Sequence, residues 1–156
     1  MNKTIKFITA VLVCEGVGIL GSILTIPSIN TWYQALNKPS FSPPNWIFGP
    51  VWTTLYFLMG VAIFLILDKK ITRAKNNILI LFSLQLFLNF LWSNIFFGLH
   101  LPLWAFIEII FLWINILLLV ILFWKYSKPA SILLVPYLLW VSFASLLNLS
   151  IVILNK

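Results

Sequence analysis

The sequence predicts an all-α integral membrane protein with five transmembrane helices. Of its 156 residues, 62% are hydrophobic and 8% are charged, whereas a soluble domain carries about 25% charged residues. The apolar residues fall into five stretches, each close to the roughly 20 residues that a helix needs to cross the hydrocarbon core. These stretches do not alternate apolar and polar residues, which disfavours a transmembrane β-barrel. We place the helices in a single domain, residues 1–156, at about 6–26, 46–67, 78–99, 104–124 and 130–154.

The first stretch begins like a secretory signal, because Lys3 and Lys6 precede its apolar run. The run continues to Ile26 without a prompt small-x-small cleavage site, so we expect it to remain as the first helix. Gly18 and Gly21 are expected to let a neighbouring backbone come close. A polar face of this helix comprises Glu15, Gly18, Ser22 and Thr25.

The segment 27–45 is expected to be an ordered lid loop between the first two helices. Prolines fix φ and remove amide donors, so we expect no regular helix or central strand here. The segment also has several aromatic residues and one charge, Lys38, which is unlike a disordered linker. The prolines that carry this expectation are Pro39, Pro43, Pro44 and, just beyond the segment, Pro50, and the aromatic residues are Trp32, Tyr33, Phe41 and, just beyond it, Trp46.

Polar and aromatic side chains recur at helical spacing on the last four predicted helices. In a bilayer such stripes face protein or a cavity, which implies one shared interior. The stripes comprise Trp52, Tyr56 and Met59 on the second helix, Gln85, Asn89, Trp92, Ser93 and Phe96 on the third, Trp104, Glu108, Phe111 and Asn115 on the fourth, and Tyr137, Trp140, Ala144 and Asn148 on the fifth.

Two interpretations of this interior remain open. Interhelical hydrogen bonds of about 0.6 kcal/mol each explain polar stripes without any ligand. Large aromatic side chains, in contrast, leave slots suited to planar ligands, which favours a cavity. The two intramembrane acids, Glu15 and Glu108, are either functional groups or structural ones that bond to residues such as Ser22 and Asn115.

The basic residues predict the orientation of the chain. One side of the membrane holds the N-terminus and segments 68–77 and 125–129, and the other holds the lid loop and the C-terminus. By the positive-inside rule the N-terminus is cytoplasmic, and the lid loop and C-terminus lie outside. The net charge of +7 therefore reports topology, and no nucleic-acid-binding fold accompanies it. The first side carries Lys3, Lys6, Lys69, Lys70, Arg73, Lys75, Lys125 and Lys128, against Lys38 and Lys156 on the other.

Residues for metal or conventional acid-base chemistry are scarce. His100 and Cys14 are each the single residue of their type, so neither belongs to a group of ligands typical of a metal site. No glycine-rich phosphate loop and no hydrolase constellation is present. We therefore expect no metal and no cofactor.

Three long, irregular motifs extend over the predicted spans. They are WYQALNKPSFSPPNWIFGPVWTTLYFLMG (32–60), QLFLNFLWSNIFFG (85–98) and PYLLWVSFASLLN (136–148). They resemble the motif blocks of the translocator protein family, also called tryptophan-rich sensory proteins or peripheral-type benzodiazepine receptors. Two features differ from that family: Phe41 stands where it usually has Trp, and the cholesterol-type motif that animal members carry at the end of the fifth helix is missing.

The resemblance implies a five-helix bundle, often a homodimer, with a pocket closed by the loop between helices 1 and 2. It implies binding of porphyrins such as protoporphyrin IX and of synthetic isoquinoline carboxamides. Some bacterial members are reported to degrade protoporphyrin under light, with the tryptophans matching Trp52 and Trp140 implicated. The family's pocket residues correspond to Tyr33, Pro43, Trp52, Tyr56, Asn89, Trp92, Trp140 and Ala144.

Together these observations predict a porphyrin-binding receptor or sensor of the cell membrane, linked to tetrapyrrole handling or a stress response. One alternative is a light-dependent porphyrin-degrading enzyme with Trp52 and Trp140 as catalytic residues, and a second is a translocator of porphyrin-like or lipid ligands. The expected partners are a porphyrin, membrane lipid and a second copy of the chain, without nucleic acid. The candidate ligand-binding residues are Ser22, Tyr33, Pro43, Trp52, Tyr56, Gln85, Asn89, Trp92, Phe96, Trp140 and Ala144.

Overall fold

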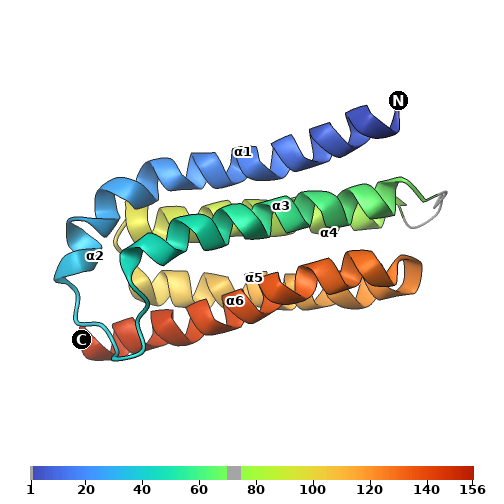
Figure 1. Ribbon diagram of the computed structural model, residues 1–156. Coiled ribbons are helices and arrows are strands. Elements are labelled where there is room, and N and C mark those ends of the chain that lie inside the picture. The colour runs from blue at the N-terminus through green and yellow to red at the C-terminus, as the bar shows by residue number, and fades with distance from the viewer. Residues whose placement is uncertain (1, 70–74) are drawn as a thin grey trace.

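The structure is a computed structural model that describes residues 2–69 and 75–156. In this part of the chain, five helices are long and apolar enough to cross a membrane, which confirms the predicted all-α class with five spans. They are α1 (Lys3–Ile29), α3 (Phe48–Leu67), α4 (Lys75–Ser93), α5 (Pro102–Tyr126) and α6 (Lys128–Leu154), as Figure 1 shows. The short elements are α2 (Trp32–Ala35), the 3₁₀ turn η1 (Asn45–Ile47) before α3, and the π-helical turn η2 (Asn94–Gly98) after α4.

Helix α1 extends beyond the expected 6–26 at both ends and includes Pro27 in its last turn. The expectation that segment 27–45 holds no regular helix is therefore wrong for residues 27–29, and α2 contradicts it for residues 32–35. The prolines used for that expectation begin at Pro39, so they do not restrain the backbone before it. Pro27 removes one backbone hydrogen bond and crowds the carbonyl four residues before it, yet the helix continues for two more residues. Lys70 and Arg73, which contribute to the topology prediction, lie outside the described residues.

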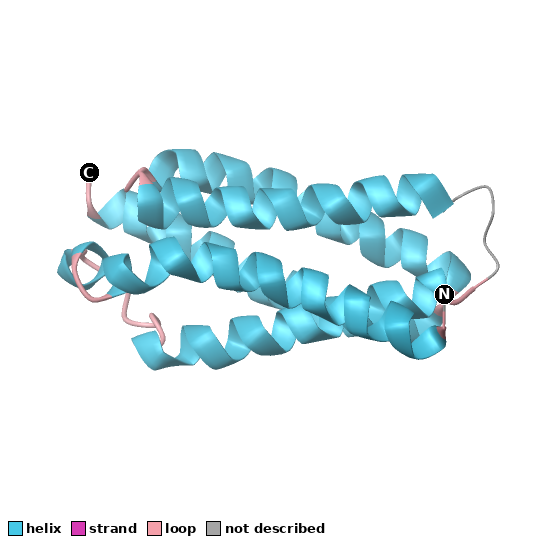
Figure 2. Cartoon of the chain, turned by 90° about the horizontal axis from the view of Figure 1, so that it is seen from above, coloured by secondary structure: helices cyan, strands magenta, loops and turns pink. Residues whose placement is uncertain are grey.

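The long helices form a closed ring. Helix α1 packs between α3 and α4, α3 also touches α6, and α5 completes the ring between α6 and α4. Figure 2 shows the bundle from above with its helices running lengthwise. The lid segment, α2 and the C-terminus lie at one end of the bundle, and the N-terminus lies at the opposite end (Figure 1). We call the first of these the lid end.

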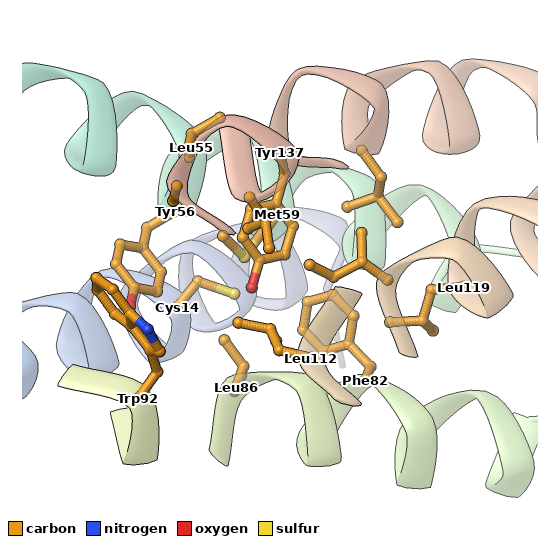
Figure 3. Close-up of a cluster of buried hydrophobic side chains, with 14 of the residues drawn as sticks. Cys14, Leu55, Tyr56, Met59, Phe82, Leu86, Trp92, Leu112, Leu119 and Tyr137 are labelled. Atoms are coloured by element: carbon orange, nitrogen blue, oxygen red, sulfur yellow. The ribbon is translucent and has the colours of Figure 1, made fainter. Parts of the chain in front are cut away.

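The interior is built from side chains of every long helix. Figure 3 shows Cys14 of α1, Met59 of α3, Phe82 of α4, Leu112 of α5 and Tyr137 of α6 directed into one common core, and each of them is at most 5% exposed. Because hydrophobic side chains in lipid gain little from burial alone, close van der Waals packing of this kind holds such a bundle together.

Helix α1 is the least embedded wall of the ring. Only 11% of its apolar window is buried, against 28–39% for the other four spans. Its backbone comes close to that of α3, because a Cβ atom placed on Gly60 would lie 2.6 Å from Val11 Cα. The nearest neighbour of Gly18 is the side chain of Tyr56, and among the described residues only side-chain atoms of Ser93 lie within 4 Å of a Cβ atom placed on Gly21, so the expected backbone contact is wrong at Gly21.

Candidate functional site

The chain between α1 and α3, residues 30–44, forms a lid that three contacts tie to the bundle. The ring of Trp32 stacks on His100 with centroids 4.3 Å apart, and the ring of Phe41 meets Phe143 of α6 at 6.1 Å. The third contact is reciprocal. The backbone N–H of Asn37 donates to Asn155 Oδ1, and Asn155 Nδ2 donates to the carbonyl of Asn37, both at 2.9 Å.

Tyr33 is the lid residue that enters the bundle. Its side chain is 1% exposed, and its ring lies 6.1 Å from that of Phe48 at the start of α3. Lys38 Nζ donates to the carbonyl of Tyr33 at 3.1 Å and lies 4.8 Å from the centre of its ring. Burial raises the pKa of the Tyr33 phenol, and its hydrogen bond with Ser42 partly opposes that shift. Tyr33 is therefore uncharged at physiological pH and covers the lid side of the bundle interior with a neutral ring.

Beneath Tyr33 lies a small aromatic cavity of about 20 Å³, which we call the aromatic site. Trp52 of α3 and Trp140 of α6 meet there edge to face, with centroids 6.5 Å apart, within the range that favours aromatic pairs. Among the described residues, no acceptor bonds the buried Nε1 of Trp140. The site is lined by Tyr33, Phe48, Trp52, Trp92, Phe96, Phe97, Trp140, Ala144, Leu147, Asn148 and Ile151.

A larger cavity of about 210 Å³ lies between α1, α3 and α4, and we call it the lateral cavity. Phe48, Trp52, Trp92 and Phe97 line both cavities and form the wall between them. Ligand pockets usually measure about 300–1,000 Å³, so a large ligand requires this wall or α1 to move. The other lining residues are Glu15, Gly18, Ile19, Gly21, Ser22, Thr25, Ile26, Ile29, Gly49, Thr53, Tyr56, Asn89 and Ser93.

Buried hydrogen bonds fix the walls of both cavities. The hydroxyl of Tyr56 donates to Asn89 Oδ1 at 2.6 Å, and Asn89 Nδ2 donates to the hydroxyl of Tyr137 at 2.8 Å. The indole N–H of Trp92 donates to Asn148 Oδ1 at 3.2 Å, and Asn148 Nδ2 donates to the carbonyl of Pro102 at 2.8 Å. Because each of these side chains comes from a different helix than its partner, the network holds α3, α4, α5 and α6 in register.

The two intramembrane acids occupy different surroundings. Glu15 lines the lateral cavity, and Ser22 donates to the carbonyl of Ile19 rather than to Glu15. Glu108 is 7% exposed, and in the described chain neither its carboxyl oxygens nor Asn115 Oδ1 have a hydrogen-bond partner. The bond considered between Glu108 and Asn115 is therefore absent.

The structure brings together most of the residues that the sequence predicted for the site. Ser22, Tyr56 and Asn89 line the lateral cavity, and Trp52 and Trp92 line both cavities. The aromatic site holds Tyr33, Phe96, Trp140 and Ala144.

Two predicted residues line neither cavity. Pro43 lies in the lid, and Gln85 is buried farther along α4. Sequence reasoning also missed Phe48 and Phe97, which form half of the wall between the cavities. For Phe48 a signal exists, because it precedes Trp52 by one helical turn and so shares its face.

A sequence model of the TspO/MBR family matches residues 10–154 of this chain. The chain belongs to the TspO/MBR family. It is 45% identical to the tryptophan-rich protein TspO of Chlorobaculum tepidum over 99% of both chains. It is 43% identical to the protein of that name from Archaeoglobus fulgidus over 97% of both chains. The human translocator protein is 37% identical over 75% of this chain and 70% of its own length.

Membership of the TspO/MBR family, together with the five apolar helices, makes this a multi-pass membrane protein. The structure accounts for Phe41, which stands where the family usually has Trp. The contact of that side chain with Phe143 is between two rings, so a phenyl group supplies it without an indole N–H.

Proposed function

We propose that this member of the TspO/MBR family is a membrane receptor that binds a planar tetrapyrrole of the protoporphyrin type at the aromatic site. The observation that carries the proposal is the Trp140 indole. Its N–H is buried at a cavity wall and has no acceptor in the described residues. A buried donor without a partner costs about 1–3 kcal/mol, and a ligand with an acceptor removes that penalty.

The walls of the aromatic site suit a flat ligand. Trp92 and Phe96 are stacked with centroids 5.3 Å apart and planes 20° apart, while Trp52 and Trp140 stand edge to face. A macrocycle inserted between such rings replaces ring-to-ring contacts by contacts of similar area with its own π faces.

A bound porphyrin needs more space than the aromatic site has in the closed structure. This space becomes available when the wall between the two cavities opens, because the aromatic site of about 20 Å³ then joins the lateral cavity of about 210 Å³. Displacement of α1 supplies the rest, since α1 is the least buried helix and its packing is the easiest to exchange for lipid. Binding therefore couples to an outward movement of α1 under a closed lid.

Titration of the purified protein with protoporphyrin IX in the dark tests this proposal. Trp140→Phe keeps the aromatic face but removes the N–H, and should weaken binding about tenfold, the scale of one hydrogen bond. Trp124→Phe is the matched control, because Trp124 is 52% exposed near the end of α5 opposite the lid. If both variants bind porphyrin as tightly as the parent, the indole of Trp140 is not part of the site.

The contact between Trp52 and Trp140 favours light-dependent porphyrin degradation as a second function. Two easily oxidised indoles lie 6.5 Å apart at one cavity, so a bound macrocycle would touch both. Illumination of the saturated complexes separates the two functions. Under the degradation proposal, Trp52→Phe and Trp140→Phe slow the loss of the Soret band much more than they weaken binding. If the Soret band of the bound porphyrin is lost equally fast in the parent and in both variants, degradation is not a function of this site and only the receptor function is supported.

A further inference from the structure

The lateral cavity contains a charge-bearing group that the aromatic site does not use. Glu15 lies midway along α1, in a helix otherwise rich in apolar residues, and forms part of the cavity wall. In the described parts of the chain it makes no ion pair and no side-chain hydrogen bond. An acid at membrane depth is expensive without a partner and marks a candidate functional site.

Three of the hydroxyl groups around this cavity face it as hydrogen-bond acceptors. Ser22 Oγ donates its proton to the carbonyl of Ile19 at 2.7 Å, and Thr25 Oγ1 donates to the carbonyl of Gly21 at 3.0 Å. The Tyr56 hydroxyl donates to Asn89 at 2.6 Å. A hydroxyl has one proton and two lone pairs, so each of these groups retains only lone pairs for a ligand.

One of the two indole N–H groups in the same wall is also occupied. Trp92 Nε1 donates to Asn148 Oδ1 at 3.2 Å, which turns the indole donor away from the lateral cavity. The polar part of the cavity therefore comprises the Glu15 carboxyl group, the Asn89 amide and five hydroxyls, three of which use their protons elsewhere. With Glu15 as the one acidic side chain in this lining, the surface matches a ligand that donates hydrogen bonds and carries positive charge.

We propose that the lateral cavity is a binding site for a lipophilic amine, whose protonated nitrogen pairs with the Glu15 carboxylate. An ammonium group has three donors and no acceptor, which complements this wall. The Tyr56 ring packs against α1 at Gly18, one turn from Glu15, so the cation also lies near an aromatic face.

The remainder of the cavity fixes the shape of the ligand. It extends along α1 from Glu15 to Ile29, a distance of about 21 Å at the helical rise. Its far part is lined by Ile26, Ile29, Phe48 and Phe97, which suits an alkyl or aromatic body. A bare metal cation does not fit, because it needs about six oxygen ligands and most of this wall is apolar.

The bilayer is the route of entry. Ile19 and Ile26 line the cavity, yet they are 63% and 61% exposed on the outside of α1. An amphipathic amine dissolved in lipid thus meets the cavity between α1 and α3 without passing the lid. This inference concerns a different ligand from the porphyrin and does not depend on the proposed receptor function.

Isothermal titration calorimetry in a fixed concentration of one nonionic detergent tests the proposal with three probes of equal length, namely dodecylammonium, dodecanol and dodecanoate. The parent should bind dodecylammonium at least about tenfold more tightly than the other two, on the scale of a charged hydrogen bond. Equal affinities for the three probes would show simple partitioning of an alkyl chain and overturn the proposal.

Glu15→Gln should remove this preference, while Glu108→Gln should retain it. Glu108 is the matched control, since it is an intramembrane acid that does not line the lateral cavity.

A second variant, Gly21→Val, keeps the charge and fills the cavity, because a Cβ atom there meets only ordinary contacts at 3.5 Å and beyond. It should also abolish amine binding. Retained amine binding in Glu15→Gln, or equal loss in Glu15→Gln and Glu108→Gln, contradicts the assignment. Ala144→Leu keeps the two proposals distinguishable, because Ala144 lines the aromatic site and not the lateral cavity, so this variant should lose porphyrin binding and retain the preference for dodecylammonium.

Discussion

At the scale of single residues, Asn89 holds the interior of the bundle together. Its amide accepts a hydrogen bond from the Tyr56 hydroxyl and donates one to the Tyr137 hydroxyl, so α3, α4 and α6 meet at one side chain that is 1% exposed. Both the carbonyl oxygen and the N–H group of this amide are therefore hydrogen-bonded in the apolar interior of the bundle.

Asn89→Ala should therefore destabilise the protein more than removal of either tyrosine hydroxyl. It leaves two buried hydroxyls unpaired, for a loss of about 2–4 kcal/mol in the free energy of unfolding, whereas Tyr56→Phe leaves one group unpaired and costs about 1–2 kcal/mol. Thermal unfolding in one detergent compares the variants. If Asn89→Ala melts no lower than Tyr56→Phe, the chain of hydrogen bonds does not act as a unit.

At the scale of elements, the lid depends on the C-terminus of the chain. The paired hydrogen bonds between Asn37 and Asn155 join its middle to the end of α6, while the ring contacts of Trp32 and Phe41 hold its two sides. The two amide bonds are exposed and so are individually weak. They are suited to breaking and reforming as ligands enter and leave.

Asn155→Ala should accelerate porphyrin dissociation several-fold without unfolding the bundle, because it removes the reciprocal pair and leaves the aromatic contacts intact. Lys156→Ala is the matched control, since Lys156 is also exposed at the terminus and has no hydrogen bond among those of the described chain. Stopped-flow fluorescence measures both rates. Equal dissociation from the two variants would mean that Asn155 does not latch the lid.

Helical periodicity explains why much of the site could be predicted and why some of it could not. Asn89 and Trp92 were found because one turn of helix places them on one face. Phe97 was missed because η2 is a π-helical turn, which shifts the register so that Phe96 and Phe97 are both buried. Gln85 shares the face of Asn89, but neither cavity reaches one turn farther along α4 to include it. The helical period gives the face of a residue and does not tell how far along that face a cavity extends.

At the scale of the whole molecule, exposed tryptophans mark the two faces of the bilayer. Trp104 at the start of α5 and Trp124 near its end are 61% and 52% exposed, and the helical rise separates them by about 30 Å. That distance equals the hydrocarbon thickness of a typical bilayer. Trp46, 73% exposed, lies beside the lid at the same end as Trp104. The helix ends therefore lie at the membrane interfaces, where tryptophan is favoured.

The distribution of basic residues predicts which face is cytoplasmic. A periplasm-active reporter fused after Lys156 should be active, and one inserted at Asn76 should be inactive, because the basic segments are retained inside. A reporter active only at Asn76 would reverse the orientation and place the lid in the cytoplasm.

The central claim, that a porphyrin occupies the aromatic site, is tested most directly by a Soret difference spectrum recorded in the dark. Ala144 lines that site and is 8% exposed, so Ala144→Leu fills it. Gly16→Leu adds a comparable side chain where a Cβ atom would meet nothing within 4 Å, and serves as the control. The account predicts a saturable Soret shift with one porphyrin per chain in the parent and in Gly16→Leu, and its loss in Ala144→Leu. An identical shift in all three proteins would contradict it and place the porphyrin on the lipid-facing surface.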